Sequence, residues 1–112
     1  MALVEAEDAV RGPFETCPGC RITFAVPAGI AAARGASLEA AERYEQAATY
    51  LAEVVMRLPA WHAALAELRG HLAAARGGHE RAALQFLDAA RRFAAAGQPL
   101  DAARCDALSA ER

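Results

Sequence analysis

The stretch that decides the fold runs from residue 60 to residue 97, "AWHAALAELRGHLAAARGGHERAALQFLDAARRFAAAG". Its first half repeats apolar residues at steps of three and four, which predicts one amphipathic helix over 60–76: Trp61, Leu65, Leu68, Leu72 and Ala75. Gly77 and Gly78 break the pattern and predict a turn. The second half predicts another helix over 80–96 with its own apolar face, formed by Ala83, Phe86, Leu87, Ala90 and Phe93. The stretch therefore predicts two helices joined by a glycine turn.

Alanine dominates the whole chain and accounts for 32 of its 112 residues. It is the strongest helix former, and its small side chain lets helices approach closely. β-branched residues are few after Val26. An all-α fold is therefore predicted, and a chain of this length has room for one small domain with its own core.

The same unit occurs a second time, earlier in the chain. Residues 31–35 and residues 73–77 both read "AAARG", at an offset of 42. The register continues past the glycine and aligns further pairs, among them Ala40 with Ala82, Tyr44 with Phe86 and Ala47 with Ala89. Residues 18–34 then align with the helix at 60–76. The first unit is therefore also predicted to be two helices around a turn at Gly35.

Residues typical of helix N-termini predict where the remaining helices begin. Ser37 is a good N-cap for a long helix over 38–58, whose buried stripe would be Leu38, Tyr44, Ala48, Leu51, Val55 and Leu58. Pro59 and Pro99 suit the first turn of a helix, where a missing N–H costs little. The last helix, 99–110, is expected to bury Leu100, Ala103 and Leu108, and a short leading helix is expected over 2–11.

Both units resemble the tetratricopeptide (TPR) repeat. That family has a small residue seven before the loop glycine, then Ala, an aromatic residue and Ala at five, nine and twelve after it. Counted from Gly77 these are Gly70, Ala82, Phe86 and Ala89, and counted from Gly35 they are Ala28, Ala40, Tyr44 and Ala47. The resemblance implies helical hairpins stacked as a short α-solenoid. The spacing of 42 departs from the usual 34 because the helix at 38–58 is long, and no proline closes either unit at the usual place.

The predicted organisation is a leading helix and linker over 1–16, followed by a TPR-like domain over 17–112. That domain would hold units at about 18–58 and 60–97 and a capping helix at 99–110, with Trp61 packed in the core. The tail "AARRFAAAGQPLDAARCDAL" (89–108) resembles the terminal repeats of large LuxR-type, ATP-binding transcriptional regulators of actinobacterial style. No G-x-x-x-x-G-K-[ST] loop is present. The resemblance thus implies either a stand-alone relative or part of a larger regulator.

The spacing of Cys17 and Cys20 around Pro18 and Gly19 leaves three readings open. The motif can be the structural start of a helix, a redox pair favoured by the helix dipole, or two zinc ligands. If residues 22–26 formed a strand, the motif would resemble a zinc-ribbon knuckle. Zinc needs four ligands, however, and the chain offers only one further cysteine and three histidines: Cys105, His62, His71 and His79. Cys105 itself is expected to be a buried, inert thiol.

Composition and motifs exclude several function classes. A formal net charge of −2 indicates no field for nucleic acid, and no apolar run reaches the ~20 residues of a membrane span. The acidic first residues are unlike a signal peptide, and three cysteines do not make a disulfide scaffold, so a cytoplasmic location is predicted. No nucleophile, base or cofactor loop can be named. The chain is therefore predicted to be non-catalytic and to need no cofactor, zinc being the alternative.

The TPR resemblance implies how such a module would bind. The first helix of each hairpin lines a concave groove in that family, which makes Glu67 and His71 candidates for contact with a protein or peptide partner. The function predicted is a regulatory protein-interaction module, and the alternative is a thiol-redox or zinc sensor built on Cys17 and Cys20. Two or three hairpins leave apolar end faces uncovered. Self-association through an end or through residues 38–58, or docking onto a larger partner, is therefore expected.

Overall fold

Residues 18–111 are the part of the chain that the computed structural model describes, and helices account for nearly all of them. Their order is α2 (Pro18–Arg34), α3 (Leu38–Tyr50), the π-helical η1 (Leu51–Met56), α4 (Pro59–Ala75), α5 (His79–Ala95) and α6 (Pro99–Ala110). The predicted all-α class is confirmed for this part of the chain. The strand alternative for residues 22–26 is wrong, because they lie inside α2. The leading helix predicted over 2–11 lies outside the described residues.

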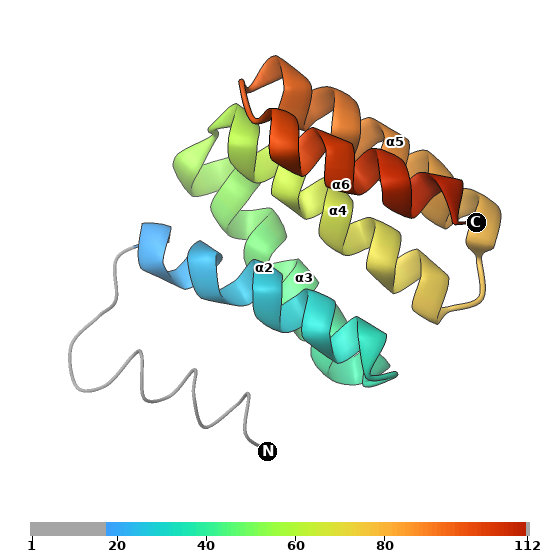
Figure 1. Cartoon of the computed structure of the whole chain (residues 1–112). Helices are drawn as coiled ribbons and strands as arrows, with labels where there is room; N and C mark the ends of the chain where they lie inside the picture. The colour runs from blue at the N-terminus through green and yellow to red at the C-terminus, as the bar shows by residue number, and fades with distance from the viewer. Residues whose placement is uncertain (1–17, 112) are drawn as a thin grey trace.

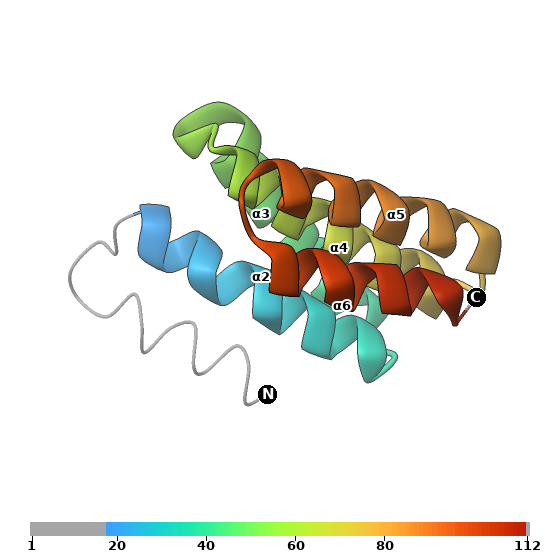
Figure 2. The same ribbon diagram turned by 45° about the horizontal axis from the view of Figure 1, so that its top comes forward.

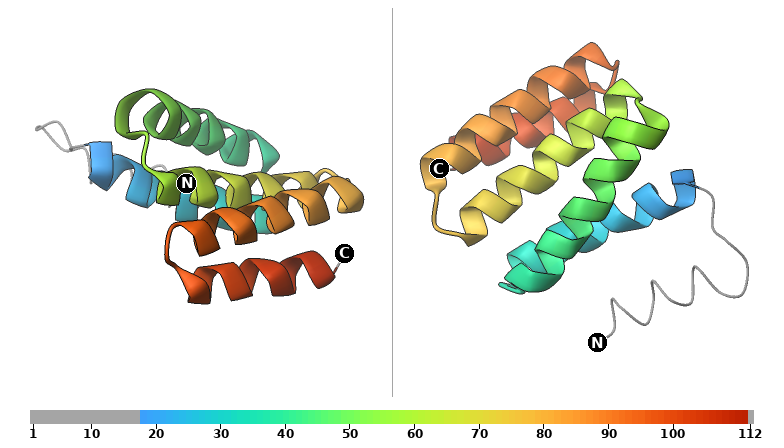
Figure 3. Two further views of the ribbon diagram at one scale, coloured as in Figure 1. Left: turned by 90° about the horizontal axis from the view of Figure 1, so that it is seen from above. Right: turned by 180° about the vertical axis from the view of Figure 1, so that it is seen from behind.

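Each helix packs against the helix that follows it in the chain, and α4 also packs against α2 (Figure 1). Seen from the front, α2 and α6 lie before α3 and α5, and the order is reversed from behind (Figure 3). The core gathers between these helices, and its largest fully buried side chains include Ile22, Leu51, Leu65, Leu68 and Leu72. The helix α4 is therefore the centre of the fold, with neighbours on several sides.

The turns between helices explain why glycine is needed at two places. Gly77 has φ +82°, its N–H donates to the Ala74 carbonyl at 3.0 Å, and the N–H of Gly78 donates to the Ala73 carbonyl at 2.9 Å. Gly97 repeats this turn with φ +79°. These bonds satisfy the last carbonyls of a helix. The residue between the helices must adopt a left-handed backbone conformation, which glycine does at no steric cost.

The first hairpin departs from the predicted register by one residue. Its left-handed residue is Ala36, with φ +61°, and not Gly35. The N–H of Ser37 donates to the Ala32 carbonyl at 2.8 Å, which is the bond that Gly78 makes in the second hairpin. The alignment of Gly35 with Gly77 is therefore wrong for the turn, which is offset by 41 residues. Ser37 does precede the first residue of α3, but no side-chain capping bond from it is found in the described chain.

The left-handed alanine gives a stability prediction. A left-handed conformation costs an L-residue roughly 1–2 kcal/mol and costs glycine almost nothing, while glycine loses more backbone entropy on folding. Ala36→Gly is therefore expected to raise the free energy of unfolding by about 0.5–1 kcal/mol. Ala94→Gly, at an exposed position in the last turn of α5, should lower it by about 0.5–1 kcal/mol. Denaturant unfolding followed by circular dichroism measures both. A loss of stability in both variants would contradict the strain at Ala36.

Two glycines let the helices cross closely. A Cβ at Gly70 would lie 2.6 Å from the Phe86 ring, so α4 and α5 meet there. A Cβ at Gly29 would lie 2.8 Å from Leu68 and 3.1 Å from Tyr44. The sequence alignment assigned this role in the first unit to Ala28, which is buried but is not the point of closest approach. Of the other residues predicted to pack the repeat, Ala40, Tyr44, Ala82, Phe86 and Ala89 are buried, while Ala47 and Trp61 are partly buried.

Two predicted apolar stripes end earlier than expected. The long helix over 38–58 is α-helical only to Tyr50 and continues as η1, so the buried stripe stops at Leu51 and Ala52. Val55 and Leu58 are exposed, contrary to the prediction. In α6 the expected core residues Leu100 and Ala103 are also exposed, and Cys105 is the buried residue. Pro59 and Pro99 do begin α4 and α6 as predicted.

Candidate functional site

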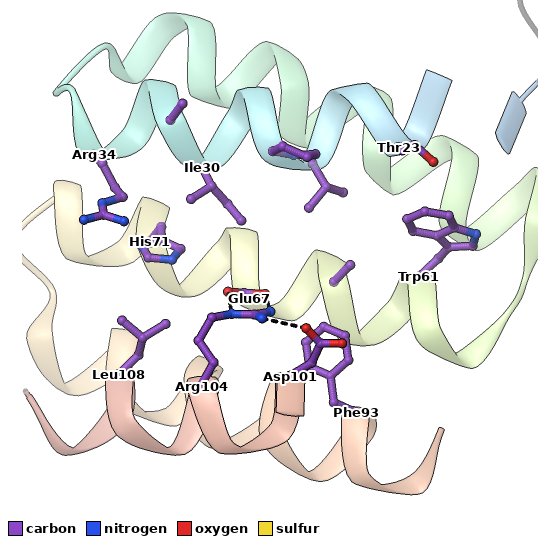
Figure 4. A pocket seen from close by; sticks show the side chains of 14 residues that line it. Thr23, Ile30, Arg34, Trp61, Glu67, His71, Phe93, Asp101, Arg104 and Leu108 are labelled. Atoms are coloured by element: carbon purple, nitrogen blue, oxygen red, sulfur yellow. Dashed lines mark hydrogen bonds and ion pairs between the residues drawn. The ribbon is translucent and has the colours of Figure 1, made fainter. Parts of the chain in front are cut away.

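A groove of about 710 Å³ is lined mainly by side chains of α2, α4 and α6. Figure 4 shows these helices in a row, with side chains from all of them directed into the space between. A cavity of this size is within the range that proteins use to enclose small molecules or anchoring side chains. The groove is the strongest candidate site in the described part of the chain.

Apolar side chains form most of the groove. Val26 and Ile30 come from α2, Trp61 and Ala64 from α4, and Leu108 from α6. Trp61 also packs against the core, in agreement with the prediction, so it contributes both to the fold and to the lining of the groove. Because it is the only tryptophan in the chain, its fluorescence would report directly on this site.

A charged cluster crosses the groove between α4 and α6. Arg104 donates from Nε to Glu67 Oε2 at 2.9 Å and from Nη2 to Glu67 Oε1 at 2.7 Å. A third bond runs from Arg104 Nη1 to Asp101 Oδ1 at 2.6 Å. Glu67 is buried, and Arg104 is half exposed. A bidentate pair of this geometry holds both side chains in place and joins α6 to the centre of the fold.

The environment keeps Arg104 fully charged. Hydrogen bonds to Glu67 raise the pKa of Arg104 further above its already high range, partial burial opposes this rise, and Asp101 adds to it. The guanidinium carbon also lies 5.8 Å from the centre of the Phe93 ring, an arrangement in which a cation is attracted to the aromatic face. Glu67 is thus committed to a contact within the chain and is not presented to a ligand as an open carboxylate.

His71 lies further along α4, near the Arg34 end of the groove (Figure 4). It is buried, and its ring meets the Phe86 ring edge to face at a centroid distance of 4.9 Å. The structure therefore places both predicted groove residues, Glu67 and His71, in the groove. Contact of either with a partner stays a prediction.

Arg34 is the charged groove residue that forms no ion pair within residues 18–111. It is exposed at the end of α2, and no ion pair joins it to an acidic side chain of that region. Glu67 and Asp101, the acids of the groove, are both engaged by Arg104. An occupant of the groove would therefore meet an apolar channel with a positive charge at the Arg34 end and a cluster of formal charge −1 between α4 and α6.

Cys105 is buried beside this cluster, as the sequence predicted. Burial raises the pKa of its thiol to about 12, and the nearby Glu67 carboxylate adds to the rise. Since the thiolate is the nucleophile and the metal ligand, a thiol with this pKa is unreactive at neutral pH.

The raised pKa predicts slow thiol labelling. In a Cys17→Ser/Cys20→Ser variant, Cys105 should react with a disulfide reagent at pH 8 about 1000-fold more slowly than an unperturbed thiol. The sign follows from the thiolate fraction, which keeps rising tenfold per pH unit until pH approaches the pKa. A Cys17→Ser/Cys105→Ala variant supplies the comparison, because Cys20 is exposed. Equal rates for Cys105 and Cys20 in the native state would contradict the burial. Both should react fully in guanidinium chloride.

The cysteine motif is only half described. Cys17 lies outside the described residues, and Cys20 is exposed in the first turn of α2. Within residues 18–111, no three side chains of His, Cys, Asp or Glu come together as a metal site would need. The redox and zinc readings stay predictions. A search of the same residues finds no helix with the length and apolar character to cross a bilayer.

Arg104, the residue that organises the groove, was not predicted from the sequence. Arg104 is 37 positions from Glu67, and no local pattern joins them. The available signal was indirect, since a buried glutamate needs a cationic partner. The contribution of α2 through Val26, Ile30 and Arg34 was missed as well, although the repeat had already aligned α2 with α4.

Comparison of the chain with protein-family models, with curated proteins and with solved structures gave no match. The fold and the groove geometry are therefore the basis for any statement about function.

Proposed function

We propose that this chain is a non-catalytic protein-interaction module that holds a peptide segment of a partner in the groove between α2, α4 and α6. The observation that supports this is the groove itself, which is apolar over three helices and open to solvent at its edges. A groove that presents apolar side chains from successive helices suits a segment with anchor residues at regular intervals.

A TPR-like arrangement is part of the proposal. Two antiparallel pairs, α2 with α3 and α4 with α5, each contain a glycine at the crossing and an aromatic residue opposite it. The first helix of each pair, together with α6, lines the groove. The TPR resemblance implies a groove lined by the first helix of each pair, and the resemblance to TPR repeats and to LuxR-type regulators is the basis on which a regulatory role in the cytoplasm is proposed.

The chemistry of the groove favours an apolar partner segment with an acidic side chain at the Arg34 end. Arg34 offers a positive charge at one end, while Arg104 pairs with both acids of the groove and leaves that three-residue cluster with a formal charge of −1. A segment with apolar anchors and one acidic side chain would place that acid near Arg34. Electrostatic complementarity of this kind contributes mainly to specificity and to the rate of association.

The groove chemistry also supports a non-catalytic role. Glu67 accepts two hydrogen bonds from Arg104 and is held away from proton transfer, and Cys105 is kept as a thiol. General base and nucleophilic catalysis need a group that is reachable and poised to react.

Selection from a random peptide display library tests the proposal. Peptides enriched on the wild-type chain are expected to be apolar with an acidic residue and to change the Trp61 fluorescence. Ala31→Glu, at an exposed position on the groove side of α2, should abolish binding of these peptides. Ala94→Glu, the same change at an exposed position of α5 away from the groove, should leave binding intact.

Arg34→Glu separates the charge preference from binding itself. It should lower the affinity for acidic peptides without removing the apolar contacts of the groove. A basic peptide with the same apolar residues should then bind more tightly than the acidic one. If no peptide is enriched, or if Ala31→Glu binds as well as Ala94→Glu, the groove is not the binding site.

A further inference from the structure

A second surface, distinct from the groove, exposes apolar side chains where α3 joins α4. The 50–58 surface, as it is named here, consists of Tyr50, Val54, Val55 and Leu58, which are between 43% and 56% exposed. Only two other large apolar residues of the described chain are exposed, Leu84 and Leu100, and they lie on α5 and α6. The segment stands out at the edge of the fold (Figure 2). Apolar exposure gathered in one short segment marks an interaction site more often than scattered single residues do.

The backbone explains why these residues point outward. Beyond Tyr50 the helix changes to π geometry, and the N–H of Arg57 donates to the Ala52 carbonyl, five residues back, at 3.0 Å. The wider turn ends the buried stripe at Leu51 and Ala52 and leaves Val55 exposed. Arg57 then ends the segment with φ +53°, a left-handed conformation that costs a non-glycine residue free energy. Single-turn π segments and strained residues are both rare and are concentrated at functional sites.

A hollow lies directly beside the exposed side chains. It has a volume of about 430 Å³ and is lined by Thr49, Tyr50, Glu53, Val54 and Arg69, among others. Tyr50 and Val54 belong both to the hollow and to the 50–58 surface. A projecting apolar edge next to a hollow is self-complementary, because a two-fold axis between them brings each edge to the other copy's hollow.

The charges around this surface are balanced. Arg69 forms ion pairs with Glu45 at 3.2 Å and with Glu53 at 3.8 Å, and Arg57 is exposed on the same segment. Two acids and two bases therefore surround the apolar residues. A face with one sign of charge would repel a copy of itself, whereas a balanced face with an apolar centre does not.

We propose that the 50–58 surface is a two-fold interface with a second copy of this chain. The interface is separate from the groove and leaves it open, so each protomer of the dimer presents its own groove. This inference does not rest on the proposed function, and peptide binding and dimer formation are measured independently.

Sedimentation equilibrium over a range of protein concentrations tests this interface with the full chain. The wild type is expected to approach twice its 11.8 kDa mass and to level off there. Val54→Glu should stay at the monomer mass, because it places a charge at the centre of the apolar surface. Leu84→Glu is the matched control on an exposed residue of α5, and its mass should follow that of the wild type.

A second variant covers the case in which Val54→Glu disturbs the fold. Tyr50→Ala removes a ring that is more than half exposed, so it leaves no cavity, and it should weaken the dimer about tenfold. A wild-type chain that remains a monomer throughout would overturn the proposal. So would a mass that rises without a plateau at the dimer, or an equal loss of the dimer in Leu84→Glu.

Discussion

Phe86→Ala is expected to lower the free energy of unfolding by about 3–5 kcal/mol, the largest single effect predicted for this chain. The Phe86 side chain is 0% exposed. It fills the space above Gly70, which has no side chain of its own, and it also meets the His71 ring. Its removal would therefore leave a cavity between α4 and α5 that no neighbour is placed to fill, and a cavity that cannot collapse carries the full cost of the lost contacts.

Leu84→Ala is the matched control for that prediction. Leu84 lies two residues earlier on α5 and is 69% exposed, so its truncation should change stability by less than about 0.5 kcal/mol. Denaturant unfolding measures both variants. Similar losses for the two would show that Phe86 does not anchor α5.

Gly70→Ala tests the same contact from α4. Its Cβ would lie 2.6 Å from the Phe86 ring, so the change should destabilise the wild type by about 1–3 kcal/mol. In the Phe86→Ala background the new methyl group has room, and the cost should largely disappear. Additive losses would contradict direct contact between the two positions.

The second hairpin could be predicted from the sequence because each of its features is local. Apolar spacing located α4 and α5, and Gly77 marked the turn between them, so residues 60–97 needed no tertiary information. In the first hairpin, local sequence features were not sufficient. Its turn is left-handed at Ala36 and its crossing glycine is Gly29, each one residue later than the repeat alignment placed them. Alanine-rich sequence accommodates such a shift without changing its pattern.

The remaining differences arise from contacts between distant residues. The change to π geometry after Tyr50 has no composition signal, and it exposes Val55 and Leu58 although their spacing fits an α-helical stripe. In α6 the buried side is set by packing against α5, which selects Cys105 over Leu100. The resemblance named Glu67 and His71 as candidates for partner contact, and both line the groove. The pairing of Glu67 with Arg104 depends on how α6 lies against α4.

Arg104→Ala is expected to lower the free energy of unfolding by about 2 kcal/mol. Glu67 is 6% exposed and would lose both hydrogen bonds from the guanidinium. An uncompensated buried charge can cost about 3–5 kcal/mol. The expected loss is smaller here because the Arg104 side chain is 47% exposed, so water can enter where the guanidinium was.

Glu67→Gln in the Arg104→Ala background tests whether the loss of stability comes from the unpaired Glu67 carboxylate. An amide carries no charge, so the double variant should regain part of the stability that Arg104→Ala loses. Arg92→Ala is the control, because Arg92 pairs with Asp88 at 2.9 Å one turn away and both side chains are about half exposed. Its loss should be below about 0.5 kcal/mol. If Arg104→Ala costs no more than Arg92→Ala, or if Glu67→Gln deepens the loss, the pair across the groove contributes no more than a surface ion pair.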